Sequence, residues 1–382
     1  MFNTNEIREF QQLETPFYYY DLGLLKKTLD IYTANLKKYS YHAHYALKAN
    51  ANDRILSIVK SYGLGADCVS GNEVKLALES GFDPSMVVYA GVGKSDKEIR
   101  AALAGNIFSF NCESVPELEI IDSIASSMGK VASVSLRINP DIDAHTHKYI
   151  STGRSQDKFG ISTWMFQDVI ETINKCKNLQ LVGLHFHVGS QITDMKVFEM
   201  LAKRVNEIQS WFFEKGIDIQ NINLGGGLGI DYENPESNPI SDFNTYFSIF
   251  NKGLEVRPGQ NIHFEPGRTI VAQCGTLISR VLYVKFGRGK KFAILDAGMN
   301  DLIRPALYQA KHKIENLTST GRIMKYDVVG PVCESSDRFS KGTLLPETKR
   351  GDIMAIRSAG AYGQVMAMKY NQRDLAPEYY SE

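Results

Sequence analysis

The sequence has no excess of charge of either sign. Its 382 residues include 43 Lys and Arg against 43 Asp and Glu, and the pI is about 7.1. Proteins that bind nucleic acids or anionic membrane surfaces usually carry a basic surface that shifts this balance. Neither a nucleic-acid partner nor a membrane partner is therefore expected. Apolar residues make up 43% and charged residues 23%, which is typical of a folded globular protein.

Long apolar runs and paired cysteines are also missing. No segment approaches the roughly 18 consecutive apolar residues of a membrane helix, and the polar start of the chain lacks the order of a secretory signal. The cysteines are scattered with no Cys-x-x-Cys spacing, which is typical of free thiols in a reducing compartment. We therefore expect a cytoplasmic protein. The five cysteines are Cys68, Cys112, Cys176, Cys274 and Cys333.

Short β-rich segments alternate with helical segments over the first two-thirds of the chain. Parallel strands need crossover connections, so this alternation predicts a parallel sheet. Eight such units fit a (β/α)8 barrel, and an open doubly wound sheet is the alternative. The expected strands are His42–Leu47, Gly65–Val69, Met86–Tyr89, Ile107–Phe110, Ala132–Ile138, Leu179–Phe186, Ile219–Leu224 and Ile262–Phe264. The expected helices are Arg54–Ser61, Glu73–Ser80, Glu113–Ala125, Trp164–Cys176, Lys196–Lys215 and Asp242–Asn251.

The last third of the chain is rich in strands and poor in helices, which predicts a separate all-β domain. The aromatic segment Phe17–Asp21 also predicts a strand, and it is expected to join that domain because it has no neighbour of its own. We therefore predict a barrel domain over residues 24–273 and a β domain made of residues 1–23 and 274–382. The expected strands are Thr276–Phe286, Lys291–Asp296, Met324–Val329, Asp352–Arg357 and Gln364–Tyr370.

Reactive side chains follow several of the predicted barrel strands, and barrel enzymes place their working residues at the C-terminal ends of strands. Lys48 closes the first strand, where desolvation lowers the pKa of an amine and makes it nucleophilic. A lysine that simply reaches solvent is the alternative. His185 and His187 end the sixth strand. Such a pair can bind a metal, stack on a planar ligand or fill the core.

Three consecutive glycines, Gly225, Gly226 and Gly227, follow the seventh strand. They predict a phosphate cradle, although a tight turn is the simpler explanation. Glu265 closes the eighth strand, either facing that loop or in a salt bridge. An amine, a flat imidazole, a phosphate cradle and a carboxylate together match the aldehyde, ring, phosphate and ring nitrogen of pyridoxal phosphate. Cys333 lies between a Gly-Pro turn and a carboxylate, and a cysteine in that position is more often structural than catalytic.

Motifs along nearly the whole chain resemble the pyridoxal-phosphate-dependent decarboxylases of the alanine-racemase-like fold type, and most closely the diaminopimelate decarboxylases. The wider group shares the Lys48 segment, the glycine loop and Glu265–Arg268; the narrower one is indicated by Arg137–Gly160 and Arg304–Tyr308. Thr15–Asp21, Cys333–Asp337 and Gly360–Gly363 also match. The resemblance implies a TIM barrel followed by a C-terminal β-barrel or sandwich domain that takes up the N-terminal strand. It also implies a homodimer with shared active sites.

The resemblance implies a role for each residue that would bind the cofactor. Lys48 is expected to hold pyridoxal 5′-phosphate as a Schiff base, His187 to stack on the ring, and Glu265 to pair with the ring nitrogen. Tyr362 is expected to contact both cofactor and substrate. Pro266 is also expected to bind the cofactor. The expected phosphate-binding residues are Ser190, Gly225, Gly226, Gly227, Gly267 and Arg268.

The implied reaction is decarboxylation of meso-2,6-diaminopimelate to L-lysine and CO2, the last step of lysine biosynthesis. Arg268, Arg304 and Tyr308 would hold the distal carboxylate. The partner chain would supply Glu334 for the distal amine and Cys333 as proton donor. Ornithine and arginine have no distal carboxylate, so a decarboxylase for either of them is the second candidate. A metal-dependent hydrolase on the same barrel, using the two histidines of the sixth strand, is a third; no metal is expected.

Overall fold

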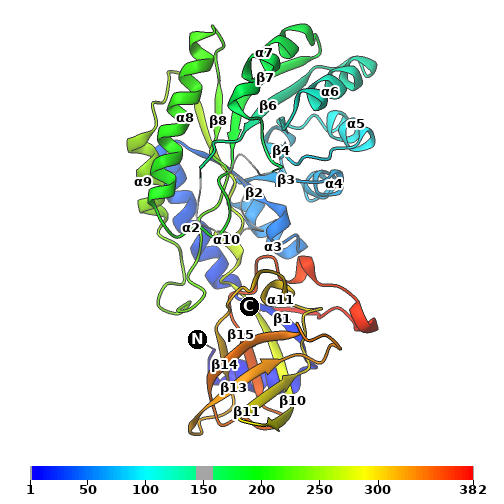
Figure 1. Cartoon of the computed structure of the whole chain (residues 1–382), viewed down its shortest axis with the longest axis vertical. Helices are drawn as coiled ribbons and strands as arrows, with labels where there is room; N and C mark the ends of the chain where they lie inside the picture. The colour runs from blue at the N-terminus through cyan, green and yellow to red at the C-terminus, as the bar shows by residue number, and fades with distance from the viewer. Residues whose placement is uncertain (1, 143–157, 382) are drawn as a thin grey trace. The chain divides into compact units, whose positions relative to one another are not determined.

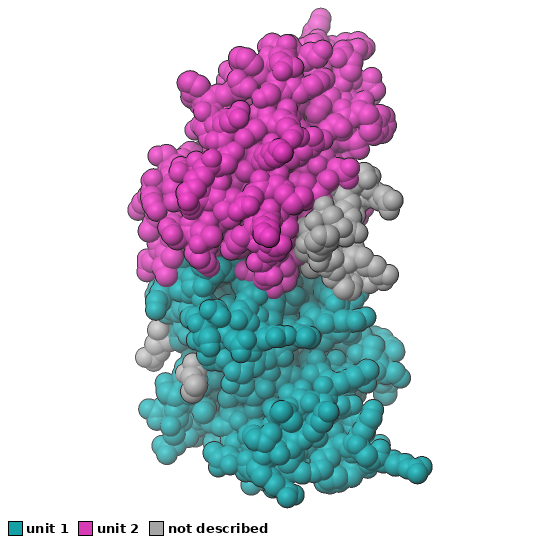
Figure 2. Space-filling view, turned by 60° about the vertical axis from the view of Figure 1, so that its left-hand side comes forward, with its two compact units in different colours: residues 1–28, 230–241, 268–382 teal, residues 29–229, 242–267 magenta. Residues whose placement is uncertain are grey.

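A computed structural model describes residues 2–142 and 158–381. The chain forms two compact units, drawn in two colours in Figure 2. The β unit comprises Met1–Thr28, Ile230–Ser241 and Arg268–Glu382, and the barrel unit comprises Leu29–Gly229 and Asp242–Gly267. The domain boundaries given above, at residues 24 and 273, stay a prediction.

Eight parallel strands of the barrel unit close into a ring (Figure 1). The last strand pairs with the first through His42↔His263 and Ala43↔Phe264, which decides against the open sheet. The predicted barrel is therefore confirmed. The strands are β2 (His42–Ala46), β3 (Gly65–Cys68), β4 (Val87–Tyr89), β5 (Ser109–Cys112), β6 (Ala132–Ile138), β7 (Leu179–Phe186), β8 (Asn221–Asn223) and β9 (Asn261–Phe264).

Five of the helices, α3, α4, α5, α6 and α9, begin at polar N-cap residues, and each of the five buries apolar side chains. In α3, for example, the Asn52 side chain accepts from two backbone N–H groups of the first turn, and Ile55, Leu56 and Val59 are buried. Two of these helices, α2 and α5, were not predicted from the sequence. The helices are α2 (Leu22–Tyr39), α3 (Asp53–Ser61), α4 (Gly71–Glu79), α5 (Asp96–Ala104), α6 (Val115–Ser127), α7 (Phe166–Lys175), α8 (Lys196–Glu214) and α9 (Phe243–Gly253).

Aromatic packing fixes the end of the last barrel strand. Tyr246, Phe247 and Phe250 of α9 surround Phe264 of β9, with ring centroids 4.9–5.7 Å apart. Each such ring pair stabilises the fold by roughly 0.5–1.5 kcal/mol, in addition to the effect of the apolar area that it buries. Because Glu265 is the next residue, this packing anchors the backbone that carries it.

The β unit is built on a mostly antiparallel sheet in the order β12-β15-β10-β11-β13-β14. The N-terminal strand β1 pairs with β10 from Phe17↔Ile278 to Tyr20↔Gly275, so the prediction that it joins this sheet is confirmed. On its other side it pairs with β16. The strands are β1 (Phe17–Tyr20), β10 (Gly275–Gly287), β11 (Lys290–Leu295), β12 (Ile314–Asn316), β13 (Ile323–Val329), β14 (Arg338–Pro346), β15 (Ile353–Ile356) and β16 (Glu378–Tyr380). The α-helices are α1 (Thr4–Gln12), α10 (Arg268–Val271) and α11 (Arg304–Tyr308).

One predicted strand, Gln364–Tyr370, is wrong. The chain forms short 3-10 helices at Gln364–Met366 and Tyr370–Gln372 instead. Backbone hydrogen bonds close these turns locally, from Met366 N to Gly363 O and from Ala367 N to Gln364 O, both at 3.0 Å. The strands β12, β14 and β16 were not predicted from the sequence.

Candidate active site

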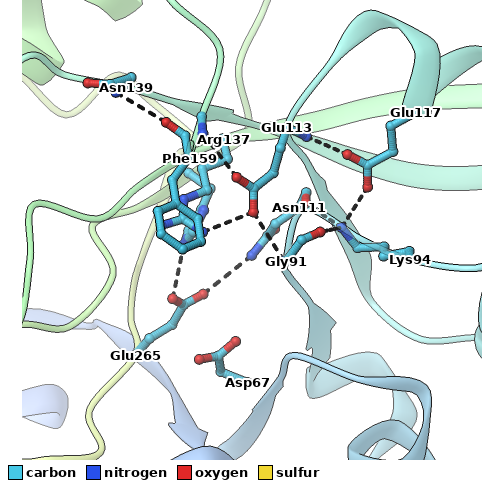
Figure 3. A network of polar contacts seen from close by, with 12 residues as sticks. Asp67, Gly91, Lys94, Asn111, Glu113, Glu117, Arg137, Asn139, Phe159 and Glu265 are labelled. Carbon is cyan, nitrogen blue, oxygen red and sulfur yellow. Dashed lines mark hydrogen bonds and ion pairs between the residues drawn. The ribbon is translucent and has the colours of Figure 1, made fainter. Parts of the chain in front are cut away.

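Glu265, the residue after β9, lies buried among three side-chain donors, of which Asn111 is labelled beside it in Figure 3. His185 Nε2 donates to Oε2 at 2.9 Å, Asn223 Nδ2 donates to Oε1 at 2.8 Å, and Asn111 lies at 3.4 Å from Oε1. Burial alone would raise the pKa of Glu265. The charge interaction and hydrogen bond with His185, helped by Lys48, outweigh it and lower that pKa. Glu265 is therefore a permanent anion at neutral pH.

Lys48 lies in a 3-10 turn, Leu47–Ala49, just after β2. The predicted strand was one residue too long, but the lysine keeps its place at the C-terminal end of the strand. Its Nζ lies 2.6 Å from Asp67 Oδ2 at the end of β3. Burial and the nearby Glu265 raise the pKa of Asp67, and Lys48 partly offsets this effect. The other oxygen, Asp67 Oδ1, is buried without a hydrogen-bond partner in the described part of the chain.

His187 follows β7 and carries a neutral ring. Burial, followed by the charges of Arg137 and Lys48, lowers its pKa well below the ordinary value of histidine. The charge interactions link His187 to Lys48 and to Glu265. The structure therefore brings together three of the predicted residues from three strand ends.

The glycine loop allows the turns after β7, β8 and β9 to meet. Gly225 has φ of +68°, and a Cβ there would lie 2.3 Å from Phe186 O. A Cβ on Gly226 would lie 2.3 Å from Glu265 O, and one on Gly227 would lie 2.7 Å from Gly189 O. Side chains at these positions would push the Glu265 and His187 turns apart. Of the other predicted residues, Ser190 lies in the turn after β7, while Pro266 and Gly267 follow Glu265.

A second buried ion pair lies at the ends of β5 and β6 (Figure 3). Arg137 donates to Glu113 Oε1 at 3.0 Å, and the other oxygen of Glu113 accepts from Gly160 N at 2.9 Å. The Arg137 guanidinium lies 4.6 Å from the Phe159 ring. This pair holds in place the Arg137 charge, which after burial is the next cause of the lowered pKa of His187. Four further polar residues at strand ends were not predicted as site residues, although their positions favour such a role: Asp67, Asn111, Glu113 and Asn223.

The β unit holds a second cluster, of two buried arginines around one tyrosine. Arg268 donates to Tyr232 Oη at 2.6 Å, and the Arg304 guanidinium lies 5.0 Å from the Tyr232 ring. Arg268 also lies 4.8 Å from the ring of Tyr362. Tyr308 is on α11 with Arg304, and its charge interaction acts on Arg268. Four predicted residues thus converge, with Tyr232 as an unpredicted fifth.

His312 orients Arg304. Its Nδ1 donates to the Arg357 carbonyl at 2.8 Å, so its Nε2 is an acceptor and receives Arg304 NH1 at 2.9 Å. Burial, then the Arg304 charge, lowers the pKa of His312 to about 3, which keeps this tautomer neutral. No carboxylate among the described residues forms an ion pair with Arg304. A buried guanidinium in that state is suited to the carboxylate of a ligand.

Cys333 and Glu334 are exposed on the loop between β13 and β14. Cys333 is a free thiol. Glu334 Oε1 accepts from Tyr370 Oη at 2.6 Å, and Cys333 N donates to Asn371 Oδ1 at 3.2 Å.

Over residues 2–142 and 158–381, no group of three or more His, Cys, Asp or Glu side chains is arranged to hold a metal ion. No helix in the same ranges is both long and apolar enough to cross a membrane. His185, on which the hydrolase alternative depended, is instead a partner of Glu265.

Comparison with known proteins agrees with this site. Residues 22–272 match the family described as pyridoxal-dependent decarboxylase, pyridoxal binding domain. The chain is 53% identical to the diaminopimelate decarboxylase of Bacteroides thetaiotaomicron, over 98% of each protein. This chain belongs to the diaminopimelate decarboxylase family. A Helicobacter pylori diaminopimelate decarboxylase solved with L-lysine is 43% identical, with a TM-score of 0.93 over 100% of this chain and 94% of that one. A lysine/ornithine decarboxylase from Vibrio vulnificus, 22% identical with a TM-score of 0.86, shares the fold.

Pyridoxal 5′-phosphate is the cofactor of these decarboxylases, and the barrel residues fit it. An amine lies beside a buried carboxylate at Lys48 and Asp67. Glu265 offers a permanent anion to a ring nitrogen, and His187 offers a neutral flat ring. In the glycine loop, the backbone next to the His187 and Glu265 turns carries no side chains. The membership in this family confirms the cofactor that the sequence analysis expected.

Proposed function

We propose that the chain decarboxylates meso-2,6-diaminopimelate to L-lysine and CO2, the last step of lysine biosynthesis. The observation that carries this proposal is Arg304, which is buried, oriented by His312 and without a carboxylate partner in the described residues. A site with this cation selects a substrate with a carboxylate at its distal end. Diaminopimelate has one, whereas ornithine and arginine do not. The similarity of this chain to bacterial diaminopimelate decarboxylases supports the assignment.

The barrel residues prepare the chemistry. When bound, pyridoxal phosphate supplies an aldehyde for covalent attachment and a pyridine ring that spreads the charge left by departing CO2. Lys48 provides the attaching amine, and Asp67 orients it from 2.6 Å. Glu265 stays ionised and holds a proton at the ring nitrogen by opposite charge. His187 stays neutral, so it stacks without opposing that proton. Backbone of the glycine loop and of Gly267, with Ser190, binds the phosphate.

The cluster in the β unit would hold the substrate. Arg268, Arg304 and Tyr308 bind the distal carboxylate, and Tyr362 contacts both cofactor and substrate.

Two residues of the site would come from a second copy of the chain. Cys333 and Glu334 are exposed on one chain, as expected of residues offered to a partner. In the homodimer, Glu334 binds the distal amine and Cys333 donates the proton that replaces CO2 at the α-carbon. The free cysteines, buried at Cys68, Cys112 and Cys274, support a cytoplasmic location.

A side-by-side assay tests the function. The purified protein with added pyridoxal phosphate is given meso-diaminopimelate, ornithine or arginine, and released CO2 and the amino-acid product are measured. We expect rapid release from diaminopimelate, with L-lysine as product, and at most trace release from the other two. Preference for ornithine or arginine would contradict the proposal, as would stoichiometric zinc in a colourless protein.

Replacing Arg304 with alanine should weaken substrate binding by about 2–5 kcal/mol, because a buried charged partner of the distal carboxylate is lost. The measurement is KM for diaminopimelate, with the cofactor spectrum as a check on the barrel site. Arg304→Lys is the matched control: it keeps the charge but loses the planar fork, so it should recover only part of the affinity. An unchanged KM in Arg304→Ala would remove Arg304 from the substrate site.

A further inference from the structure

Two neighbouring side chains of one short segment hold two neighbouring residues of the Cys333 loop. Tyr370 Oη donates to Glu334 Oε1 at 2.6 Å. Asn371 Oδ1 accepts from the backbone N–H of Cys333 at 3.2 Å. One bond orients a side chain and the other fixes the backbone before it. The segment therefore contacts the two residues that the proposed function assigns to the distal amine and to the proton.

The segment that carries these side chains has an unusual backbone. Asn371 and Gln372 have φ values of 55° and 57°, and two successive non-glycine residues in the left-handed region are uncommon. Neighbouring bonds hold the segment on both sides: Met368 N donates to Asn300 O at 2.9 Å, and Arg373 donates to Asp296 O at 2.8 Å. A strained backbone persists only where its surroundings determine it. Tyr370 and Asn371 thus belong to a built element.

An exposed glutamate has many side-chain conformations, and a ligand that needs one of them must bear the entropy of fixing it. The bond from Tyr370 selects one conformation before any ligand arrives. It occupies a single oxygen, Oε1, which leaves the second oxygen of Glu334 available to an ammonium group. A phenol donor also leaves the negative charge of Glu334 in place.

We propose that Tyr370 is a positioning residue that orients Glu334 toward the distal ammonium group of the substrate, and so contributes to specificity for a diamino-dicarboxylate. Asn371 supports this action by fixing the backbone at Cys333. The inference rests on the proposed function, since it takes the role of Glu334 from there.

A double-mutant cycle on the holoenzyme tests this inference. Tyr370→Phe removes one hydroxyl and keeps the ring. We expect it to raise KM for meso-diaminopimelate about tenfold, the loss typical of one hydrogen bond to a charged group, with kcat changed less than about twofold. Glu334→Gln should raise KM further. The double variant should be no worse than Glu334→Gln alone, because the hydroxyl acts only through that carboxylate.

Tyr283→Phe is the matched control, because Tyr283 is another exposed tyrosine of the β unit, packed against Arg350. It should leave KM and kcat unchanged. An unchanged KM in Tyr370→Phe would overturn the inference, as would effects of the two substitutions that multiply in the double variant. These failures are distinct from failure of the proposed function, in which the wild-type protein itself releases no CO2 from diaminopimelate.

Discussion

Replacing Lys48 with alanine is expected to abolish both the visible absorbance of the bound cofactor and all measurable release of CO2. The amine lies at the C-terminal end of β2, 2.6 Å from a buried carboxylate of Asp67. The absorbance spectrum, and the protein mass after borohydride reduction, check the result. Lys60→Ala is the matched control, since Lys60 of α3 contacts a backbone carbonyl of Ser80 instead.

A visible band that survives in Lys48→Ala would place the covalent attachment elsewhere. The same variant also tests the shared site of the proposed homodimer. Mixed with Cys333→Ala subunits, it should form heterodimers in which one of the two sites has both an intact Lys48 and an intact partner Cys333. Part of the activity should return. No recovery, with heterodimers demonstrated by mass, would mean that both residues act within one chain.

Replacing Glu265 with glutamine is expected to reduce turnover about 100- to 1000-fold, the loss seen when one preorganised charge-stabilising group is removed from an active site. Cofactor binding should weaken far less, because the amide keeps the shape and part of the hydrogen bonding. The reason is electrostatic: the lowered pKa of Glu265 makes it an anion at neutral pH, and glutamine cannot favour a protonated ring nitrogen.

The measurements are kcat with diaminopimelate and the dissociation constant of the cofactor. Glu265→Asp serves as control, because it keeps the charge and shortens the reach, so it should retain more activity than the amide. Equal activity of the glutamine variant and the wild type would remove the charge of Glu265 from the reaction.

The barrel could be predicted from sequence because β-rich segments alternate with helical segments along the chain. Ala132–Ile138 and Leu179–Phe186 were predicted to the residue, since they are the two longest strands of the barrel and apolar residues recur along each. In the β unit, β14 was missed because its sequence contains Arg338, Lys341 and Gly342. Its extended form depends on pairing with β13, which no local pattern reveals. The error at Gln364–Tyr370 has the opposite origin, because an apolar stretch that favours a strand forms local 3-10 turns instead.

The residues of the candidate site also fall into those that the sequence could predict and those that it could not. Lys48, His187, Glu265 and the glycines could be recognised because each follows a strand, and strand ends in a closed barrel share one edge. Tyr232 and His312 could not, because their importance comes from contact with Arg268 and Arg304 and from no motif of their own. The partners that set the protonation of a site are tertiary neighbours, and sequence proximity does not indicate them.

The pairing of β1 with β10 and β16 has a consequence for synthesis on the ribosome. Phe17 to Tyr20 of β1 emerge first. Of their two partner strands, β10 comes earlier in the sequence, and its paired residues, Gly275 to Ile278, are made more than 250 residues later. At about 5–20 residues per second, this aromatic strand waits roughly 13–50 seconds for a neighbour. Throughout that interval a nascent chain exposes three tyrosines and a phenylalanine. Cellular factors that shield hydrophobic segments of growing chains are therefore expected to improve the yield of folded protein.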